Sequence, residues 1–260
     1  MRKRLFLNLI SVFIVALTAA AALVLQTSAA AVDYGLDVGG KRVTSDRLSG
    51  EGWKFEPDTN TLTLNGFISD VADKATFMKY DKKTHVYYYA FIRVENSMNL
   101  NIKLEGKEST IGDPYISGHA AERIGNTDSY NTFYGIYNPN GNVTVTGSAR
   151  LKVYTNLRGI SASKLTMDGC TGTIMMGAYT NCINVQRLIV KGGTKINATC
   201  GYGGAMKLMY NTPIHASKSI DIYDTSEVYS EIERDNDTDD YGISGIYCDG
   251  TINVYGGKLT

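Results

Sequence analysis

Residues 159–198 read GISASKLTMDGCTGTIMMGAYTNCINVQRLIVKGGTKINA, and this stretch decides the fold class. It contains one unit twice: a Gly-Ile or Cys-Ile start, an alternating apolar strand, a glycine turn and a second alternating strand. Ile160 and Ile183 begin the two copies and lie 23 residues apart, as do Met167 and Val190. A period in the low twenties with short strands is typical of one turn of a parallel β-helix.

The same unit extends in both directions. Residues 135–153 form an earlier copy, in which Ile136 precedes its counterpart in the next copy by 24 residues. The two later copies are longer, because Val190 to Ile222 and Ile222 to Val254 are each 32 residues. Insertions in a repeat leave the stack as loops, and we therefore expect loops between the later copies.

Strict alternation along each strand predicts which side chains face inward. The first interior ladder is expected to contain Val143, Val145, Leu165, Met167, Leu188, Val190, Ile220, Ile222, Ile252 and Val254. The second is expected to contain Leu151, Val153, Ile174, Met176, Ile196 and Val228. One copy buries little apolar surface alone, so stability should come from stacking of neighbouring copies.

The N-terminus is typical of a signal peptide, predicted over residues 1–31. Arg2, Lys3 and Arg4 supply the positive start, residues 5–25 are largely apolar, and residues 28–31 are small, as a cleavage site requires. An uncleaved membrane anchor is the alternative, because the apolar run is long enough to span a bilayer.

Residues 32–80 predict an N-terminal β cap, and residues 81–260 predict the turns of the helix. Residues 35–43 have the pattern of a β-hairpin around Gly39-Gly40. The last five residues match a point where earlier copies continue into their next strand. We therefore expect the chain to be truncated at its C-terminus, or covered there by another segment. The predicted fold is all-β, a right-handed parallel β-helix (solenoid) with an N-terminal β-hairpin cap.

Composition limits the partners. The chain of 260 residues has 26 basic and 26 acidic residues, and without residues 1–31 the balance is 23 against 26. This weakly negative net charge does not predict the basic surface that binding of nucleic acid requires. Export would make the four cysteines eligible for disulfides, and four cysteines permit three pairings. We favour small, buried interior residues as the interpretation of Cys170, Cys182, Cys200 and Cys248.

Three segments carry a family resemblance: YGLDVGGKRVTS at 34–45, FEPDTNTLTLNG at 55–66 and GIYCDGTINVYGGKLT at 245–260. They resemble secreted Gram-positive bacterial carbohydrate-binding-domain-containing proteins, over roughly residues 33–260. The resemblance implies a right-handed parallel β-helix of the polysaccharide-lyase type without catalysis, at the cell surface. It also implies binding of plant-type or acidic polysaccharide, with calcium as an optional partner, and it transfers no individual site residue.

Outward residues of the predicted strands are the binding candidates. Tyrosine combines a flat apolar face with a polar tip and is suited to stacking on sugar rings. The predicted carbohydrate-binding residues are Tyr154, Asp168, Lys191, Asp221, Tyr223, Tyr229 and Tyr255. For the tyrosines the alternative is packing between copies that only stabilises the sheet.

An acidic loop supplies the metal candidates, Asp235, Asp237, Asp239 and Asp240. Carboxylates at alternate positions could ligate calcium. The loop departs from an EF-hand, with Asp240 in the place of glycine and Ile246 in the place of the last glutamate. A solvated insertion is the alternative, and no cofactor is required for the function that we expect.

That function is extracellular binding of polysaccharide or surface adhesion, without catalysis. The expected partner is a polysaccharide or cell-wall glycan, with no nucleic acid and no membrane after signal cleavage, and the expected location is secreted or cell-surface. A polysaccharide lyase or hydrolase acting on pectin-like acidic polysaccharide is the first alternative. It is weakly supported, because Asp168 beside Lys191 is the one acid–base pair expected in the best-aligned outward column. A structural surface spacer is the second alternative.

Overall fold

The computed structural model describes residues 30–69, 74–113, 130–178, 180–201, 212–233 and 245–260. The chain divides into two compact units, Met1–Val32 and Asp33–Thr260, and all of the described strands belong to the second. These residues form β-strands and one short 3-10 helix, η1 (Pro57–Thr59), and no α-helix. The prediction of an all-β protein is therefore confirmed. The predicted signal peptide lies almost wholly outside the described residues.

The strands form two sheets with long runs of parallel strands, sheet A with 14 strands and sheet B with 7 in the described parts of the chain. The main path of sheet A is β3 (Ser49–Gly50), β4 (Trp53–Glu56), β5 (Thr61–Leu64), β9 (Leu100–Leu104), β11 (Tyr130–Gly147), β13 (Arg158–Asp168), β15 (Asn181–Lys191), β17 (Ile214–Tyr223) and β19 (Ile246–Cys248). Its other strands are β1 (Asp33–Val38), β2 (Lys41–Thr44), β7 (Thr76–Asp81), β8 (Val86–Val94) and β20 (Thr251–Tyr255). Sheet B contains β6 (Ile68–Ser69), β10 (Ser109–Ile111), β12 (Leu151–Thr155), β14 (Ile174–Ala178), β16 (Lys195–Gly201), β18 (Glu227–Glu233) and β21 (Lys258–Leu259).

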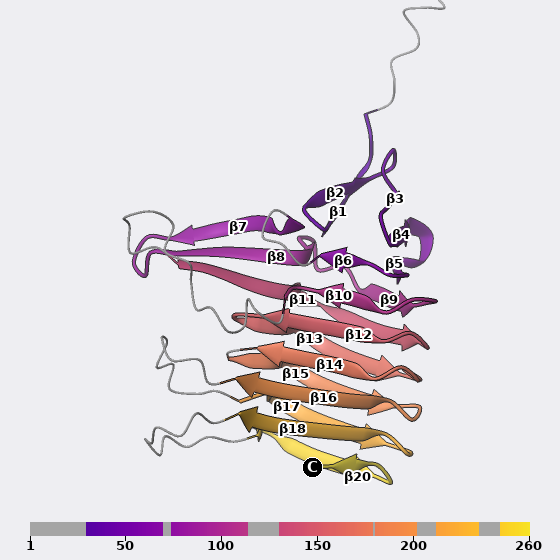
Figure 1. The fold of residues 1–260 in the computed structure, drawn as a ribbon, viewed down its shortest axis with the longest axis vertical. Coiled ribbons are helices and arrows are strands. Elements are labelled where there is room, and N and C mark those ends of the chain that lie inside the picture. The colour runs from indigo at the N-terminus through magenta and orange to yellow at the C-terminus, as the bar shows by residue number, and fades with distance from the viewer. Residues whose placement is uncertain (1–29, 70–73, 114–129, 179, 202–211, 234–244) are drawn as a thin grey trace, which may run out of the picture. The chain divides into compact units, whose positions relative to one another are not determined.

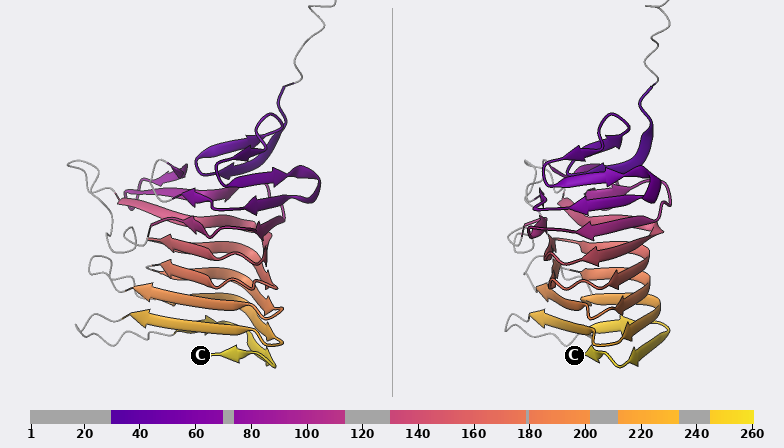
Figure 2. Two further views of the ribbon diagram at one scale, coloured as in Figure 1. Left: turned by 45° about the vertical axis from the view of Figure 1, so that its right-hand side comes forward. Right: turned by 90° about the vertical axis from the view of Figure 1, so that its right-hand side faces the viewer.

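From β9 to β18 the chain alternates between the sheets, so that each of these copies adds one strand to sheet A and then one to sheet B (Figures 1 and 2). The pairing has the register that the repeat predicts: Ile160 lies opposite Ile183, and Met167 lies opposite Val190. The longer copies keep this register, with Ile222 opposite Val254. Equivalent positions of successive copies therefore stack on one another.

Both predicted interior ladders are buried, with two exceptions in the last described sheet A strand, β20. Ile252 and Val254 were expected inside, but each is 45% exposed. The reason is that β20 pairs with β17 alone, and no described strand covers its other edge. Alternation predicted the direction of these side chains, but burial also needs a neighbouring copy.

At the turn between the two sheets, hydroxyl side chains of successive copies form hydrogen bonds with backbone groups. The backbone N–H of Cys170 donates to Thr194 Oγ1 at 3.1 Å, and the N–H of Thr194 donates to Ser226 Oγ at 3.2 Å. Thr194 Oγ1 in turn donates to the carbonyl oxygen of Lys191 at 2.8 Å. Backbone groups buried at a turn need partners, and here each copy takes one from the next.

The hairpin predicted at residues 35–43 is present. Gly39 and Gly40 have φ values of 58° and 72°, as a two-residue hairpin turn requires, and Val38 pairs with Lys41. Strand β1 also pairs antiparallel with β8. Parallel pairing begins already at β5, which lies beside β9 and within the range predicted as the cap.

Val190 and Lys191 give a sharp test of the register, since they are neighbours on one strand. Val190→Asp should lower the free energy of unfolding by at least about 4 kcal/mol, because an unpaired carboxylate would enter the apolar interior. Lys191→Ala should change it by less than about 1 kcal/mol, since its ion pair is exposed. Urea denaturation followed by circular dichroism measures both. Equal tolerance of the two substitutions would contradict the assigned inward face.

Candidate functional site

Four of the seven predicted binding residues lie in one outward column of sheet A, which we call the outer column. Asp168 pairs with Lys191 across β13 and β15, and Tyr223 pairs with Tyr255 across β17 and β20. The two halves join because Val190 lies opposite Ile222, one residue before Lys191 and Tyr223 respectively. The outer column therefore crosses four successive copies.

The charged half of the outer column is a half-exposed ion pair. Lys191 Nζ lies 2.9 Å from Asp168 Oδ2, and the two side chains are 43% and 41% exposed. Water screens such pairs, so they contribute little to stability. Both groups remain accessible to a polar ligand.

Asp221 lies next to the outer column and is held by neutral groups. Its Oδ2 accepts a hydrogen bond from Ser219 Oγ at 3.0 Å, and its Oδ1 accepts one from Asn253 Nδ2 at 2.7 Å. Asp221 and Tyr223 are two residues apart on β17, so their side chains point to the same side of the strand. The carboxylate is thus fixed in position beside the tyrosine pair.

The tyrosines of the outer column stack on each other. The ring centroids of Tyr223 and Tyr255 are 4.9 Å apart, with planes inclined by 16°. The facing surfaces of the two rings are therefore filled, which supports the alternative of packing between copies. Tyr255 is still 55% exposed, so part of the pair stays open to a ligand.

Tyr154 and Tyr229 lie on sheet B, on strands that carry the second interior ladder. Tyr154 is in β12, and its ring lies over Gly177, where a side chain would collide with it. Tyr229 is in β18, and its hydroxyl donates to Glu231 Oε2 at 2.9 Å. The seven predicted residues are therefore divided between two sheets.

The predicted metal ligands Asp235, Asp237, Asp239 and Asp240 lie outside the described residues. Within the described ranges, no group of three or more histidine, cysteine or acidic side chains could hold a metal ion. In the same ranges, no helix is long and apolar enough to cross a membrane.

A second aromatic pair was missed at the sequence level. His215 on β17 stacks on Tyr247 on β19, with centroids 5.5 Å apart and planes inclined by 22°. His215 Nδ1 lies 2.8 Å from Asn184 Oδ1, and Nε2 lies 3.7 Å from Asp249 Oδ2. We call these four residues the His215 cluster. The signal was available, because the 32-residue offset of the longer copies connects positions 215 and 247.

Among the described residues, a chain of aromatic rings in contact lies on β7, β8 and β11. It runs outward from the core in the order Phe91, Phe133, Tyr89, Phe77, Tyr87 and Tyr80, with ring centroids 4.4 to 6.4 Å apart. Phe91 is fully buried, whereas Phe77 is 50% exposed. These rings extend the core onto the β7–β8 hairpin, and a stabilising role accounts for their contacts.

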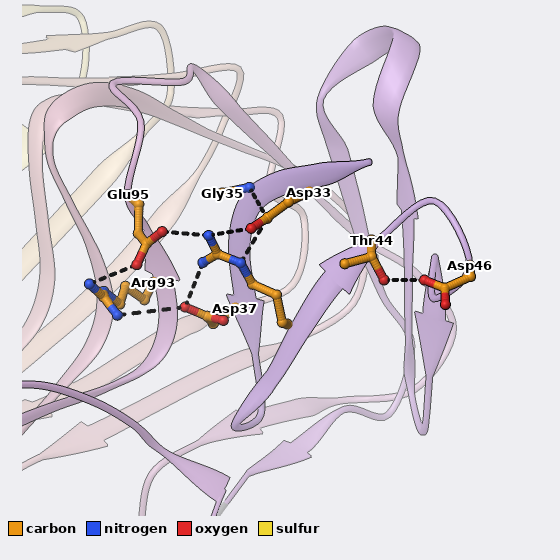
Figure 3. Close-up of polar contacts among 8 residues, drawn as sticks. Asp33, Gly35, Asp37, Thr44, Asp46, Arg93 and Glu95 are labelled. Atoms are coloured by element: carbon orange, nitrogen blue, oxygen red, sulfur yellow. Dashed lines mark hydrogen bonds and ion pairs between the residues drawn. The ribbon is translucent and has the colours of Figure 1, made fainter. Parts of the chain in front are cut away.

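The densest charge cluster lies at the N-terminal hairpin (Figure 3). Arg42 contacts Asp33 at 2.7 Å, Asp37 at 3.2 Å and also Glu95, while Arg93 contacts Glu95 at 2.9 Å. Burial raises the pKa of Asp37, and the two arginines oppose that shift. The hydrogen bond from Arg42 lowers the pKa of Asp33. Every charge has a partner of opposite sign, so this network joins β1, β2 and the end of β8.

Comparisons with protein-family models, with curated proteins and with solved structures find no match to this chain. Any function proposed for it therefore has to follow from its own residues and their arrangement. The two arrangements on the outer surface of sheet A, the outer column and the His215 cluster, are the candidate site.

Arg42→Ala should weaken the hairpin network most at neutral pH. The substitution removes the charge that offsets the burial of Asp37 and the donor that lowers the pKa of Asp33. Both losses destabilise the fold only while the two carboxylates are ionised. The deficit in the free energy of unfolding is therefore present above about pH 4, and it becomes smaller as the carboxyls are protonated. The expected loss in the free energy of unfolding is about 1–3 kcal/mol at pH 7.

Denaturation of the Arg42→Ala variant at pH 7 and at pH 3.5 measures this difference. Lys41→Ala is the matched control, because Lys41 is the exposed neighbour of Arg42 on β2. A deficit of equal size at both pH values would show that the side chain of Arg42 acts by packing and not by charge.

Proposed function

We propose that this protein is an extracellular polysaccharide-binding or surface-adhesion protein without catalysis, built as a right-handed parallel β-solenoid. The parallel pairing of equivalent positions in successive copies, and the alternation of the chain between two sheets, support a solenoid. The apolar run and small residues of the first 31 positions support export. The proposed ligand is a polysaccharide or cell-wall glycan.

The observation that carries the proposal is the outer surface of sheet A on β17, β19 and β20. Aromatic pairs lie at both ends of this surface, His215 with Tyr247 and Tyr223 with Tyr255. Asp221, with its partner Asn253, lies between them. Sugar chains offer hydroxyls that donate and accept hydrogen bonds, and apolar C–H surfaces that pack on aromatic rings.

The length of this surface suits a chain ligand. His215 and Tyr223 are eight residues apart on β17, which corresponds to at most roughly 26 Å at 3.3 Å per residue, and the pairing of β17 with β15 shifts register between Ala216 and Ser219. A linear polysaccharide lying along β17 could contact both aromatic pairs and the carboxylate between them. Such a ligand gains affinity from several weak contacts along the strand.

The charged groups of this surface already have polar partners, and this supports binding without catalysis. Asp168 is paired with Lys191, and Asp221 accepts hydrogen bonds from Ser219 and Asn253. General acid–base catalysis needs a group that can reach the reacting proton of a bound substrate. In and beside the outer column, these groups bind one another and also offer polar contacts to a ligand.

The double variant Tyr223→Ala/Tyr255→Ala tests the site. We expect retention on acidic and neutral polysaccharides to fall by about tenfold or more, since stacking on each ring is worth about 0.5–1.5 kcal/mol. Affinity electrophoresis and a glycan array, each with and without calcium, measure retention. The melting temperature should fall by only about 2–6 °C, because the interior ladder is untouched.

Phe77→Ala is the matched control, because Phe77 is an exposed aromatic residue on β7 outside the candidate site, and its loss should leave retention unchanged. Unchanged retention in the double variant with a large loss of stability would favour a structural spacer. Release of unsaturated oligosaccharides from pectin would overturn the non-catalytic proposal.

Export can be tested separately by N-terminal sequencing of protein from the culture medium. The expected mature N-terminus lies between Ala30 and Val32, directly after the small residues. Intact Met1 in a membrane fraction would favour the uncleaved anchor.

A further inference from the structure

Two of the four cysteines lie together in the interior. Cys182 is near the start of β15 and Cys200 is near the end of β16, and both are fully buried. Cys182 Sγ lies 3.3 Å from the carbonyl oxygen of Thr199, the residue before Cys200. Cys200 Sγ lies 3.4 Å from the carbonyl oxygen of Thr180, two residues before Cys182. Each thiol thus reaches the backbone beside the other cysteine.

The other two cysteines have different neighbours. Cys170 lies at the turn between β13 and β14, and its Sγ contacts the carbonyl oxygen of Val145 at 3.3 Å. Cys248 is only partly buried, and its Sγ contacts the carbonyl oxygen of Thr251 at 3.5 Å. The backbone contacts of these two thiols lie away from Cys182 and Cys200. Of the three pairings that four cysteines allow, contact in the fold singles out the one that contains Cys182–Cys200.

We propose that Cys182 and Cys200 form a disulfide bond that fastens the end of β16 to the start of β15. The oxidant is a disulfide, either of a thiol oxidoreductase or of a small molecule such as oxidised glutathione. One cysteine thiolate attacks a sulfur of that disulfide, releases a thiolate and forms a mixed disulfide. The second cysteine thiolate then displaces the remaining thiolate, so that two protein thiols are oxidised and one disulfide is reduced to two thiols.

The bond has to form before the interior closes. Burial, together with the hydrogen bond to the Cys200 thiol, raises the pKa of the Cys182 thiol well above its ordinary value. A thiol with a raised pKa has little of the reactive thiolate at neutral pH. Oxidation should therefore succeed during folding and be slow in protein that has already folded with reduced thiols.

The bond would constrain the unfolded chain. It encloses residues 183–199, which contain the rest of β15 and the first five residues of β16. Closing a loop of this length removes conformational freedom from the unfolded state and so stabilises the fold. The next described strand, β17, begins at Ile214, so the bond would secure the stack just before its first long copy.

Oxidative refolding of the purified full chain tests the proposal. The chain is refolded in a buffer of reduced and oxidised glutathione, alkylated, digested without reduction and analysed by mass spectrometry. We expect a cross-link between the peptides that contain Cys182 and Cys200, with Cys170 and Cys248 alkylated. The cross-link should raise the melting temperature by roughly 6–12 °C over that of the reduced protein.

Two double variants serve as controls. Cys170→Ser/Cys248→Ser should keep both the cross-link and the rise in melting temperature, and Cys182→Ala/Cys200→Ala should lose both. Alkylation of all four cysteines after oxidative refolding, or a cross-link that involves Cys170 or Cys248, would overturn the proposal. The cross-link is mapped in the unsubstituted chain, so the result does not depend on whether a variant folds. Because the redox buffer is supplied, the result is also independent of export and of polysaccharide retention.

Discussion

The structure depends on one constraint, the parallel backbone pairing of equivalent positions in successive copies. Ile160 on Ile183 and Leu188 on Ile220 show that each inward side chain lies on an inward side chain of the next copy. Apolar positions therefore build a continuous interior, and the backbone groups of one copy are satisfied by the next. The hydroxyls of Thr194 and Ser226 at the turns follow the same rule, because each accepts a hydrogen bond from a backbone N–H of the preceding copy.

The same constraint creates the outer surface. Outward residues stack just as inward ones do, so a pair of residues one repeat apart becomes a contact pair. Lys191 with Asp168, Tyr255 with Tyr223 and Tyr247 with His215 all arise in this way. The candidate site is thus a set of columns, and its chemistry is set by which residue types recur at one position of the repeat. Such a surface suits a ligand that is itself a chain.

The N-terminal end of the stack shows how pairing changes where the repeat begins. There β1 and β4 pair antiparallel with β8 and β5, so the edge is formed by short irregular strands. Edges of this kind limit further pairing with other chains. The hairpin is held by charges as well as by backbone hydrogen bonds, since Arg42 contacts carboxylates on β1 and on Glu95, the residue that follows β8.

The sequence by itself determined the all-β class, the hairpin turn at Gly39-Gly40 and the inward faces of the strands that carry the two predicted ladders. These follow from alternation and turn chemistry, which are local, and from the recurrence of equivalent positions along the chain. Only the tertiary structure decided that the ring of Tyr154 lies over Gly177 and that the hydroxyl of Tyr229 donates to Glu231, because such contacts depend on side-chain rotamers and packing. The tertiary structure also decided the exposure of Ile252 and the contact between Cys182 and Cys200. Burial and side-chain contact depend on which segments pack together, and that is a property of the folded stack.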